Sequence, residues 1–176
     1  MSEYQIAVIG GDGIGPEVTR EAMKVVDAAA DVFGFSIKRN VYPFGTDHYV
    51  AKGEIFPEPA FEELRGMDAI FLGAIGDPRV PVGLIEYGII AKLRFELDLY
   101  ANVRPVKLYD ERLCPIKGKG PADIDMVFVR ENTEDAYAGM HGFANKGQPL
   151  EVSTQTMVYT REATERAVRF AFDLAV

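Results

Sequence analysis

The sequence predicts an α/β protein that begins with a parallel sheet and continues as a mixed, α+β arrangement. Up to residue 100, short apolar runs alternate with longer amphipathic segments in the order strand, helix, strand, helix, strand. That order is typical of a parallel sheet covered by helices. The runs Ile6–Ile9 and Asp68–Leu72 are apolar with little alternation, as in strands buried on both faces. Beyond residue 100 the predicted strands follow one another more closely, which indicates a domain boundary there.

The first strand ends in a glycine-rich turn, Gly10–Gly15, and the first helix follows it. Pro16 suits the first helical turn, and Glu17 suits the positive end of the helix dipole. The helix is expected to run to Phe33, because Gly34 is a natural C-terminal stop. Its predicted apolar face consists of Val18, Ala22, Val25, Val26, Ala29 and Val32.

Four further segments complete the first part of the chain. Residues 35–42 alternate as a second strand, and residues 59–64 are read as a short helix. The third strand, 68–72, is followed by a proline-marked loop. A second long helix is predicted over residues 84–100.

The later part of the chain contains three predicted strands and one helix. The strands are expected at 103–109, 124–129 and 152–159, and Pro105 confines the first of them to an edge or a bulge. Thr160 is suited to cap the final helix. That helix is expected to bury Ala163, Ala167, Phe170, Ala171 and Leu174.

Composition excludes several classes of protein. The chain has 176 residues and a net charge of −8, so it lacks the basic surface of a nucleic-acid-binding protein. Its 48% hydrophobic content argues against global disorder. Cys114 is the single cysteine, which excludes an internal disulfide and a cysteine-based zinc site. Residues 1–10 resemble neither a signal peptide nor a membrane span, so we expect a cytoplasmic protein that does not associate with membranes.

The glycine-rich turn does not match the dinucleotide-binding fingerprint of a Rossmann fold. In Gly11-Asp12-Gly13-Ile14-Gly15-Pro16 the third glycine comes one residue early. The second strand also ends in Val41-Tyr42-Pro43, without the acidic residue that would bind a ribose. Two interpretations remain: the amides of the helix N-terminus hold an anion, or the segment is simply a tight turn. The residue types alone favour the turn.

Three arginines, Arg94, Arg104 and Arg130, lie near the ends of predicted elements in this acidic chain. A guanidinium group pairs with a carboxylate through two parallel hydrogen bonds. If the three converge, they would hold a small di- or tricarboxylate. If they lie apart, they are ordinary surface arginines.

Tyr137 follows a buried strand, within the polar run Val129–Gly139. Such a position is typical of a functional loop, and a phenol can act as a general acid. We interpret the carboxylates of the same run, Glu131, Glu134 and Asp135, as a solvated loop rather than as metal ligands.

Four segments in this order resemble the β-decarboxylating dehydrogenases, the family of isopropylmalate, isocitrate, homoisocitrate, tartrate and D-malate dehydrogenases. The resemblance covers nearly the whole chain and corresponds to the N-terminal half of such an enzyme. It implies the α/β fold of isopropylmalate and isocitrate dehydrogenases, with a nicotinamide site that is not of the Rossmann type. The segments are Gly11–Glu17, Gly73–Gly76, Leu93-Arg94 with Asn102–Pro105, and Val129–Gly139.

The resemblance assigns roles residue by residue. Arg94, Arg104 and Arg130 match the arginines that bind the malate part of the substrate, and Tyr137 matches the tyrosine that protonates the enol after decarboxylation. Residues that match the NAD site are Ile14, Ala74, Ile75, Gly76 and Glu86.

The resemblance also implies what lies outside this chain. The aspartates that bind Mg²⁺ or Mn²⁺, and the lysine that acts as base and lowers the pKa of the tyrosine, would follow residue 176. No metal ligand is therefore expected within the chain, and the 176-residue chain alone is expected to be inactive. Residues 1–99 would form the first part of the large, cofactor-side domain. Residues 100–176 would begin the smaller domain, which binds substrate and forms a homodimer.

The predicted substrate is a 2-hydroxy dicarboxylate, and 3-isopropylmalate ranks first because Ile89 and Ile90 favour an alkyl substituent. The spacing from Gly88 to Arg94 is one residue longer than the usual isopropylmalate pattern and closer to tartrate and D-malate enzymes. The Glu-Asn-Thr-Glu-Asp run is closer to isocitrate enzymes. NADP in place of NAD stays open.

A rival interpretation of the chain is a non-catalytic, half-length module that binds carboxylates or serves in assembly. The last helix is still amphipathic at Val176, without a stop signal, which favours truncation of a longer enzyme over this rival. The reading frame beyond Val176 would separate the two.

Overall fold

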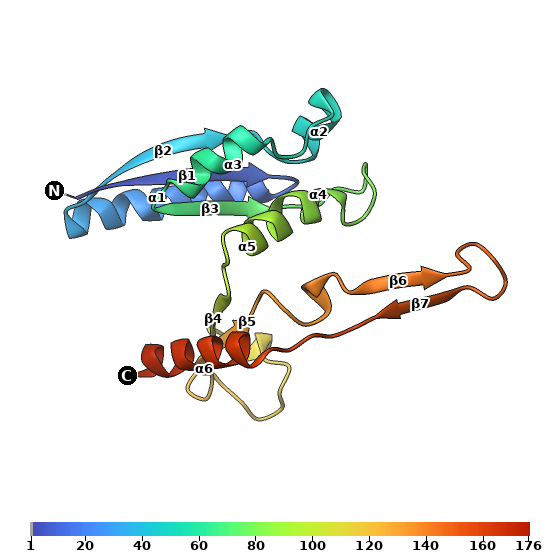
Figure 1. The fold of residues 1–176 in the computed structure, drawn as a ribbon. Coiled ribbons are helices and arrows are strands. Elements are labelled where there is room, and N and C mark those ends of the chain that lie inside the picture. Colours follow the sequence, from blue (N-terminus) through green and yellow to red (C-terminus); the bar gives the residue numbers. More distant parts are fainter. Residues whose placement is uncertain (1) are drawn as a thin grey trace. The chain divides into compact units, whose positions relative to one another are not determined.

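A computed structural model describes residues 2–176. The chain forms two compact units, Met1–Leu93 and Arg94–Val176 (Figure 1). Assignment of residues 1–99 and 100–176 to a large and a small domain stays a prediction. Among residues 2–176, no helix combines the length and the apolar character needed to cross a lipid bilayer.

The first unit is built on a parallel three-stranded sheet, which confirms the predicted α/β class. Its strands are β1 (Glu3–Gly11), β2 (Ser36–Tyr42) and β3 (Ala69–Ala74), in the order β2-β1-β3. Both neighbours of β1 run parallel to it. In the central strand Ala7 and Ile9 point to one face and Val8 to the other, and all three are buried, which is why this segment is apolar on both faces.

Helix α1 (Gly15–Phe33) confirms the predicted bounds, with proline in its first turn and Gly34 as a left-handed C-cap at φ 71°. The predicted apolar face is wrong in part, because Val18, Val25 and Val32 are exposed. The sequence carries two apolar stripes, and packing against the sheet selects only one of them. The buried residues of α1 are Gly15, Thr19, Met23 and Ala30.

Two short helices follow β2. Helix α3 (Glu58–Arg65) was predicted, and it buries Phe61 and Leu64. Helix α2 (Thr46–Lys52) was not predicted, because its seven residues show no apolar period. It begins after Gly45 and ends at Gly53, whose left-handed backbone closes the helix.

The second long helix is continuous from α4 (Leu84–Glu86) through the π-helical turn η1 (Tyr87–Ala91) to α5 (Lys92–Glu96). It ends at Glu96 instead of the predicted residue 100. Asp98 adopts a left-handed φ of 48°, and the Leu99 amide donates to the Arg94 carbonyl at 2.9 Å.

The second unit contains two antiparallel ribbons. Strands β4 (Ala101–Lys107) and β5 (Asp125–Glu131) form the first ribbon, in which Pro105 lies on an edge strand as expected. Strands β6 (His141–Ala144) and β7 (Val152–Gln155) form the second. Strand β6 was not predicted. Strand β7 is shorter than predicted, because the residues after it leave the ribbon and form an isolated bridge between Asp135 and Val158.

Helix α6 (Arg161–Ala175) packs on β5. Thr160 is its N-cap, as predicted, and the Thr160 hydroxyl accepts a hydrogen bond from the Ala163 amide at 3.1 Å. Ala163 and Ala167 are buried, whereas the predicted core residue Leu174 is half exposed.

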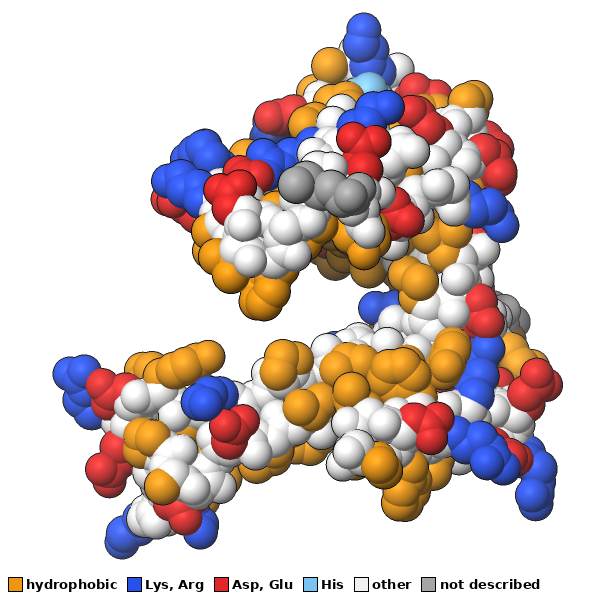
Figure 2. Space-filling view, turned by 90° about the vertical axis from the view of Figure 1, so that its left-hand side faces the viewer, with side chains coloured by type: hydrophobic (Ala, Val, Ile, Leu, Met, Phe, Trp, Pro, Cys, Tyr) orange, Lys and Arg blue, Asp and Glu red, His pale blue; other side chains and the backbone are white. Residues whose placement is uncertain are grey.

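The surface mixes charges of both signs. On the face shown in Figure 2, acidic and basic side chains are interspersed, with hydrophobic side chains reaching the surface between them. On this face the acidic side chains do not gather into a single patch.

Candidate functional site

The β4–β5 ribbon has two faces with different side chains. Its register places Asn102 opposite Arg130 and Arg104 opposite Phe128. Paired residues of an antiparallel ribbon share a face, and diagonal neighbours lie about 7–8 Å apart. Arg104 and Arg130 therefore project from the same face.

Two guanidinium groups lie close to the Tyr137 ring. It belongs to the short 3₁₀ turn η3 (Ala136–Ala138), which follows β5. The Cζ atom of Arg94 lies 5.1 Å from the centre of the Tyr137 ring, and that of Arg130 lies 5.2 Å from it. We call Arg94, Arg104, Arg130 and Tyr137 the arginine–tyrosine cluster. The structure thus brings Arg94 and Arg130 to Tyr137, and the ribbon places Arg104 beside Arg130.

The arginines act on the acidity of the phenol. Hydrogen bonding to Arg130 and the positive charge of Arg130 lower the pKa of Tyr137, and the charge of Arg94 adds to the effect. Burial and the negative charge of Asp135 act in the opposite direction, and the lowering prevails. A charge that lowers this pKa is therefore already present within the chain, besides any contribution from a lysine elsewhere.

Arg104 is held by a chain of side-chain amides. The Arg104 Nε donates to Asn102 Oδ1 at 3.1 Å, and Asn102 Nδ2 donates to Asn132 Oδ1 at 3.2 Å. Asn132 is buried, and its Nδ2 donates to the Leu99 carbonyl at 3.0 Å. Neither asparagine was singled out from the sequence. The only signal was their place beside the two arginine-bearing segments.

The clustered arginines have no carboxylate partner among the residues that the structure describes. Within residues 2–176, no ion pair involves Arg94, Arg104 or Arg130. Their charges are thus uncompensated by the described chain and are available to an anionic ligand. The arginines that do pair with carboxylates are Arg20, Arg39, Arg65, Arg79, Arg112, Arg166 and Arg169.

The carboxylates near Tyr137 organise the loop. Burial raises the pKa of Glu131, but hydrogen bonds from Thr133 and Glu134 outweigh it and lower that pKa overall. Glu134 accepts from both the amide and the hydroxyl of Thr160, each at 2.7 Å. The run is half-buried and hydrogen-bonded, so the prediction of a solvated loop is wrong here. Across residues 2–176, no group of three or more His, Cys, Asp or Glu side chains is suited to hold a metal ion.

Asp135 has an unusual backbone conformation two residues before Tyr137, with φ 67° and ψ −141°. Its amide donates to the Val158 carbonyl at 2.9 Å. The Tyr159 hydroxyl donates to Asp135 Oδ1 at 2.6 Å. The loop is therefore tied to the segment that precedes α6.

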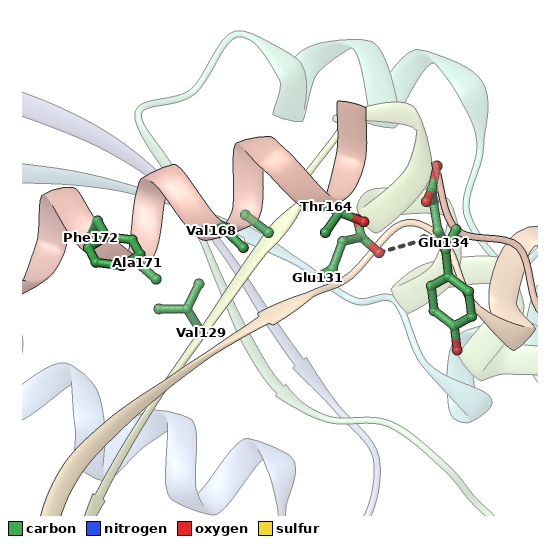
Figure 3. Close-up of a pocket in the computed structure, with 9 residues that line it drawn as sticks. Val129, Glu131, Glu134, Thr164, Val168, Ala171 and Phe172 are labelled. Atoms are coloured by element: carbon green, nitrogen blue, oxygen red, sulfur yellow. Dashed lines mark hydrogen bonds between the residues drawn. The ribbon is translucent and has the colours of Figure 1, made fainter. Parts of the chain in front are cut away.

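A pocket of about 470 Å³ lies between α6 and β5 (Figure 3). Val129 and Glu131 of β5 line it, on the face of the ribbon opposite to Arg130. The pocket is apolar toward Phe172 and polar near Glu131, which accepts from the Glu134 amide at 2.8 Å. It is therefore distinct from the arginine–tyrosine cluster.

In the first unit, most of the residues predicted for NAD gather where β1 and β3 end. The Asp12 amide donates to the Ala74 carbonyl at 2.6 Å, and a Cβ at Gly11 would lie 2.1 Å from that carbonyl oxygen. Ile75 also lies against Gly11. A Cβ at Gly76 would lie 3.2 Å from Glu86 Oε1, so Gly76 and Glu86 are neighbours.

Ile14 is the N-cap of α1 and is 68% exposed. Its side chain is thus available to a ligand at the end of the same turn. An exposed isoleucine at this position needs no partner within the chain.

No role was predicted for Asp12, yet this carboxylate connects three turns. It is buried and accepts hydrogen bonds from the Thr46 amide at 2.6 Å, the Thr46 hydroxyl at 3.1 Å and the Gly76 amide at 3.0 Å. The sequence signal that could have identified Asp12 was an acidic residue between two glycines directly after a buried strand.

The two isoleucines predicted to select the substrate have different environments. Ile89 is completely buried and is a core residue of the first unit, so its side chain is not exposed to a ligand in this structure. Ile90 is only half-buried. Both lie in η1, where a π turn accommodates one residue more than an α turn. The extra residue between Gly88 and Arg94 therefore falls in or beside this turn.

Comparisons with known proteins agree on one family. A family model described as isocitrate/isopropylmalate dehydrogenase matches residues 5–176. A 3-isopropylmalate dehydrogenase of Thermobifida fusca is 49% identical over 168 residues, which cover 96% of this chain and 48% of that protein. A 3-isopropylmalate dehydrogenase of Corynebacterium glutamicum is 47% identical and covers 97% of this chain and 49% of its own length.

A solved structure shares the fold. The crystal structure of isocitrate dehydrogenase from Methylococcus capsulatus matches with a TM-score of 0.79 and 31% identity, over 98% of this chain and 47% of that chain. The chain spans about half the length of the curated relatives it matches.

Proposed function

This chain belongs to the isocitrate/isopropylmalate dehydrogenase family, and we propose that it supplies the substrate-binding arginines and the proton donor of a decarboxylating 2-hydroxy-acid dehydrogenase that uses NAD. The observation that carries this proposal is the arginine–tyrosine cluster. It combines uncompensated guanidinium groups with a phenol whose pKa is lowered.

The arginines suit a dicarboxylate. A guanidinium group binds a carboxylate through two parallel, charge-assisted hydrogen bonds. Arg104 and Arg130 project from one face of the ribbon, and Arg94 reaches the same tyrosine as Arg130. Together they would fix both carboxylates of the substrate and hold its reacting carbons near Tyr137.

Tyr137 suits the last chemical step. Loss of hydride from C2 of the substrate, and of the proton of the C2 hydroxyl to the base, leaves a 2-keto acid with a carboxylate β to the ketone. Loss of carbon dioxide from that carboxylate leaves an enolate, which must be protonated on carbon. The Tyr137 phenol donates this proton, and the charges of Arg130 and Arg94 stabilise the phenolate that remains.

NAD, when bound, accepts the hydride from C2. We expect it beside the turn at the end of β3, where Gly76 leaves space next to the Glu86 carboxylate. A carboxylate there is suited to bind ribose hydroxyls. The predicted lining residues are Ile14, Ala74, Ile75, Gly76 and Glu86.

A divalent cation, Mg²⁺ or Mn²⁺, supplies an electron sink for decarboxylation when it is bound. The ligand set for such a cation does not fit residues 2–176, because they contain no suitable group of carboxylates. We therefore assign neither its ligands nor the base to this chain, and place them in the remainder of the enzyme.

The proposed substrate is 3-isopropylmalate. Two 3-isopropylmalate dehydrogenases share 49% and 47% identity with this chain, against 31% for the isocitrate dehydrogenase of known structure. Isocitrate, homoisocitrate, tartrate and D-malate are the alternative substrates. We also propose that the enzyme works as a cytoplasmic homodimer, with residues 1–99 in its large domain and 100–176 in its small domain.

The proposal is tested in the full-length polypeptide that contains this chain. NADH formation is measured with isopropylmalate, isocitrate, D-malate and tartrate in the presence of Mg²⁺, beside the 176-residue chain alone. We expect turnover of isopropylmalate by the full-length protein and none by the chain alone. Turnover by the chain alone would contradict the assignment of the base and metal to other segments.

Tyr137→Phe separates the two steps of the reaction. We expect it to lower kcat for oxidative decarboxylation by about 10²–10⁴-fold. Reduction of the corresponding keto acid by NADH needs no enol protonation and should be affected much less. Equal loss of both rates would indicate a defect in folding or binding. No loss would show that Tyr137 has no part in the chemistry.

A further inference from the structure

The backbone of Asp135 is held in a conformation that aspartate rarely adopts. Its φ of 67° lies in the left-handed region, and its ψ of −141° lies far from the usual left-handed helical value. Such a residue persists only where its surroundings determine its conformation. Within residues 2–176, Asp98 and Asn145 are the other non-glycine residues with positive φ.

The surroundings of Asp135 supply that constraint on both sides of the residue. Its amide donates to the Val158 carbonyl at 2.9 Å, and the Val158 amide donates back to the Asp135 carbonyl at 3.4 Å. The side chain accepts from the Tyr159 hydroxyl at 2.6 Å. Backbone and side chain are thus both bound to the segment just before α6.

The turn that carries Tyr137 begins at this fixed residue. The Ala138 amide donates to the Asp135 carbonyl at 3.3 Å, which closes η3 around Tyr137. The conformation of Asp135 therefore determines the direction in which η3 leaves β5. That direction brings the Tyr137 ring close to the guanidinium groups of both Arg94 and Arg130.

We propose that Asp135 is a positioning residue: bound to Val158 and Tyr159, it orients the turn that presents the Tyr137 phenol to Arg94 and Arg130. Its effect on turnover rests on the proposed function, whereas its effect on the phenol does not.

Positioning and simple electrostatics predict opposite results. The negative charge of Asp135 raises the pKa of Tyr137, whereas Arg130 and Arg94 lower it. If Asp135 acted only through its charge, removing that charge would lower the pKa further. If Asp135 positions the phenol, losing the anchor moves the phenol away from the guanidinium groups, and its pKa rises.

Three substitutions separate these effects. Asp135→Asn keeps an oxygen that can accept from Tyr159 and tolerates positive φ, so it removes the charge but not the anchor. Asp135→Ala removes the side-chain anchor to Tyr159 and leaves only the backbone hydrogen bonds to Val158 to hold the strained conformation. Tyr159→Phe removes the donor of the same hydrogen bond without touching Asp135, and it serves if Asp135→Ala does not fold. Tyr109→Phe, at an exposed tyrosine of the same unit, is the matched control.

The measurement is a ¹⁹F NMR pH titration of the full-length protein labelled with fluorotyrosine, in which the Tyr137 resonance is assigned by its loss in Tyr137→Phe. Relative to the labelled parent, we expect the pKa of Tyr137 to rise in Asp135→Ala and in Tyr159→Phe. It should fall in Asp135→Asn and stay unchanged in Tyr109→Phe. A fall or no change in both Asp135→Ala and Tyr159→Phe would overturn the proposal.

Kinetics supply the second readout. We expect Asp135→Ala to lower kcat for decarboxylation about 10- to 100-fold, with a much smaller change in KM, because a displaced catalytic group costs rate more than binding. Asp135→Asn, which keeps an acceptor for Tyr159, should retain most of the parental kcat. If Tyr137→Phe leaves turnover intact, the proposed function fails, and the titration still decides whether Asp135 positions the phenol.

Discussion

The two units of the molecule differ in how they bury apolar side chains. The first unit has an apolar core around its central strand and helix α3, in which Ile9, Phe61, Leu64, Ile85 and Ile89 are at most 1% exposed. In the second unit the buried hydrophobic residues are two alanines of α6, Ala163 and Ala167. An isolated two-stranded ribbon is only marginally stable in water, and the second unit is built on two such ribbons, of which the β4–β5 ribbon is supported by α6.

The two units therefore contribute differently, the first mainly to stability and the second to the proposed chemistry. In the first unit, apolar burial determines whether the chain folds. The second unit is held largely by hydrogen bonds and ion pairs, and it leaves the arginine–tyrosine cluster accessible. We therefore expect core substitutions in the first unit to affect stability most, and polar substitutions in the second unit to affect activity most.

The largest effect on stability is expected from Phe61→Ala. Phe61 is completely buried and packs edge-on against Phe56 at 5.9 Å between ring centres. Its truncation should lower the free energy of unfolding by about 3–5 kcal/mol, measured by urea denaturation followed by circular dichroism.

The matched control is Phe172→Ala in α6, whose side chain is 71% exposed. It should cost less than about 1 kcal/mol. Similar losses for the two phenylalanines would remove the distinction between the units.

The next effect concerns activity and the three arginines. In the full-length enzyme, each of Arg94→Lys, Arg104→Lys and Arg130→Lys should cost about 2–5 kcal/mol of transition-state stabilisation, because an ammonium group cannot reproduce the planar guanidinium contact. The measurement is kcat/KM for isopropylmalate.

Arg161→Lys, at another arginine of the second unit that forms no ion pair within residues 2–176, is the control and should be nearly neutral. If all three cluster variants keep the parental kcat/KM, the arginines do not bind the substrate.

A smaller effect is expected at the N-terminus of α6. The Thr160 hydroxyl accepts from the Ala163 amide and donates to Glu134 at 2.7 Å, so Thr160→Ala removes a cap and a loop contact together. We expect a loss of about 1 kcal/mol in unfolding free energy. Thr160→Ser keeps the hydroxyl and should retain most of that stability. Equal losses would show that the hydroxyl is not what stabilises the helix.

The smallest effect is a pH dependence in the first unit. Hydrogen bonds from the Arg79 side chain and amide hold the pKa of Asp77 at about 2, below its ordinary value of 3.8. A depressed pKa adds stability above the ordinary value, and this contribution is lost as the pH falls toward 2. Asp77→Asn should therefore be less stable than the parent at pH 5, with the difference shrinking toward pH 2 in thermal unfolding. Arg79→Gln should reduce the same dependence, and a constant difference would contradict the assigned cause.

Sequence reasoning predicted the parallel sheet, the bounds of α1 and the caps Gly34 and Thr160, because these depend on local apolar runs and on cap chemistry. It also predicted the family, and the match to residues 5–176 confirms it. It missed α2 and β6, whose segments carry no apolar period. It was wrong in part about the buried face of α1, where Val18, Val25 and Val32 are exposed, because packing against the sheet determines which side of the helix is buried.

The candidate site was predictable only as a set of residue types. The motifs singled out Arg94, Arg130 and Tyr137, and the structure brings these three together. The roles of Asp12 and Asp135 as hydrogen-bond acceptors depend on contacts with residues distant in sequence, such as Thr46 and Tyr159. No local sequence pattern specifies such contacts. Nor does the sequence around Asp135 predict that this aspartate adopts a positive φ.

The π turn before Arg94 allows the helix to gain or lose one residue without being disrupted. Residues on either side, Glu86 and Lys92, have ordinary α-helical backbone angles, so the irregularity is confined to Tyr87–Ala91. Deleting one residue there would convert the wide turn into a regular one while the flanking segments keep their helical form. Natural variants could thus gain or lose a residue here without loss of the helix, rotating side chains upstream while Arg94 keeps its place in α5. A single insertion or deletion, rather than a series of substitutions, is then a short evolutionary route between relatives that accept different acids.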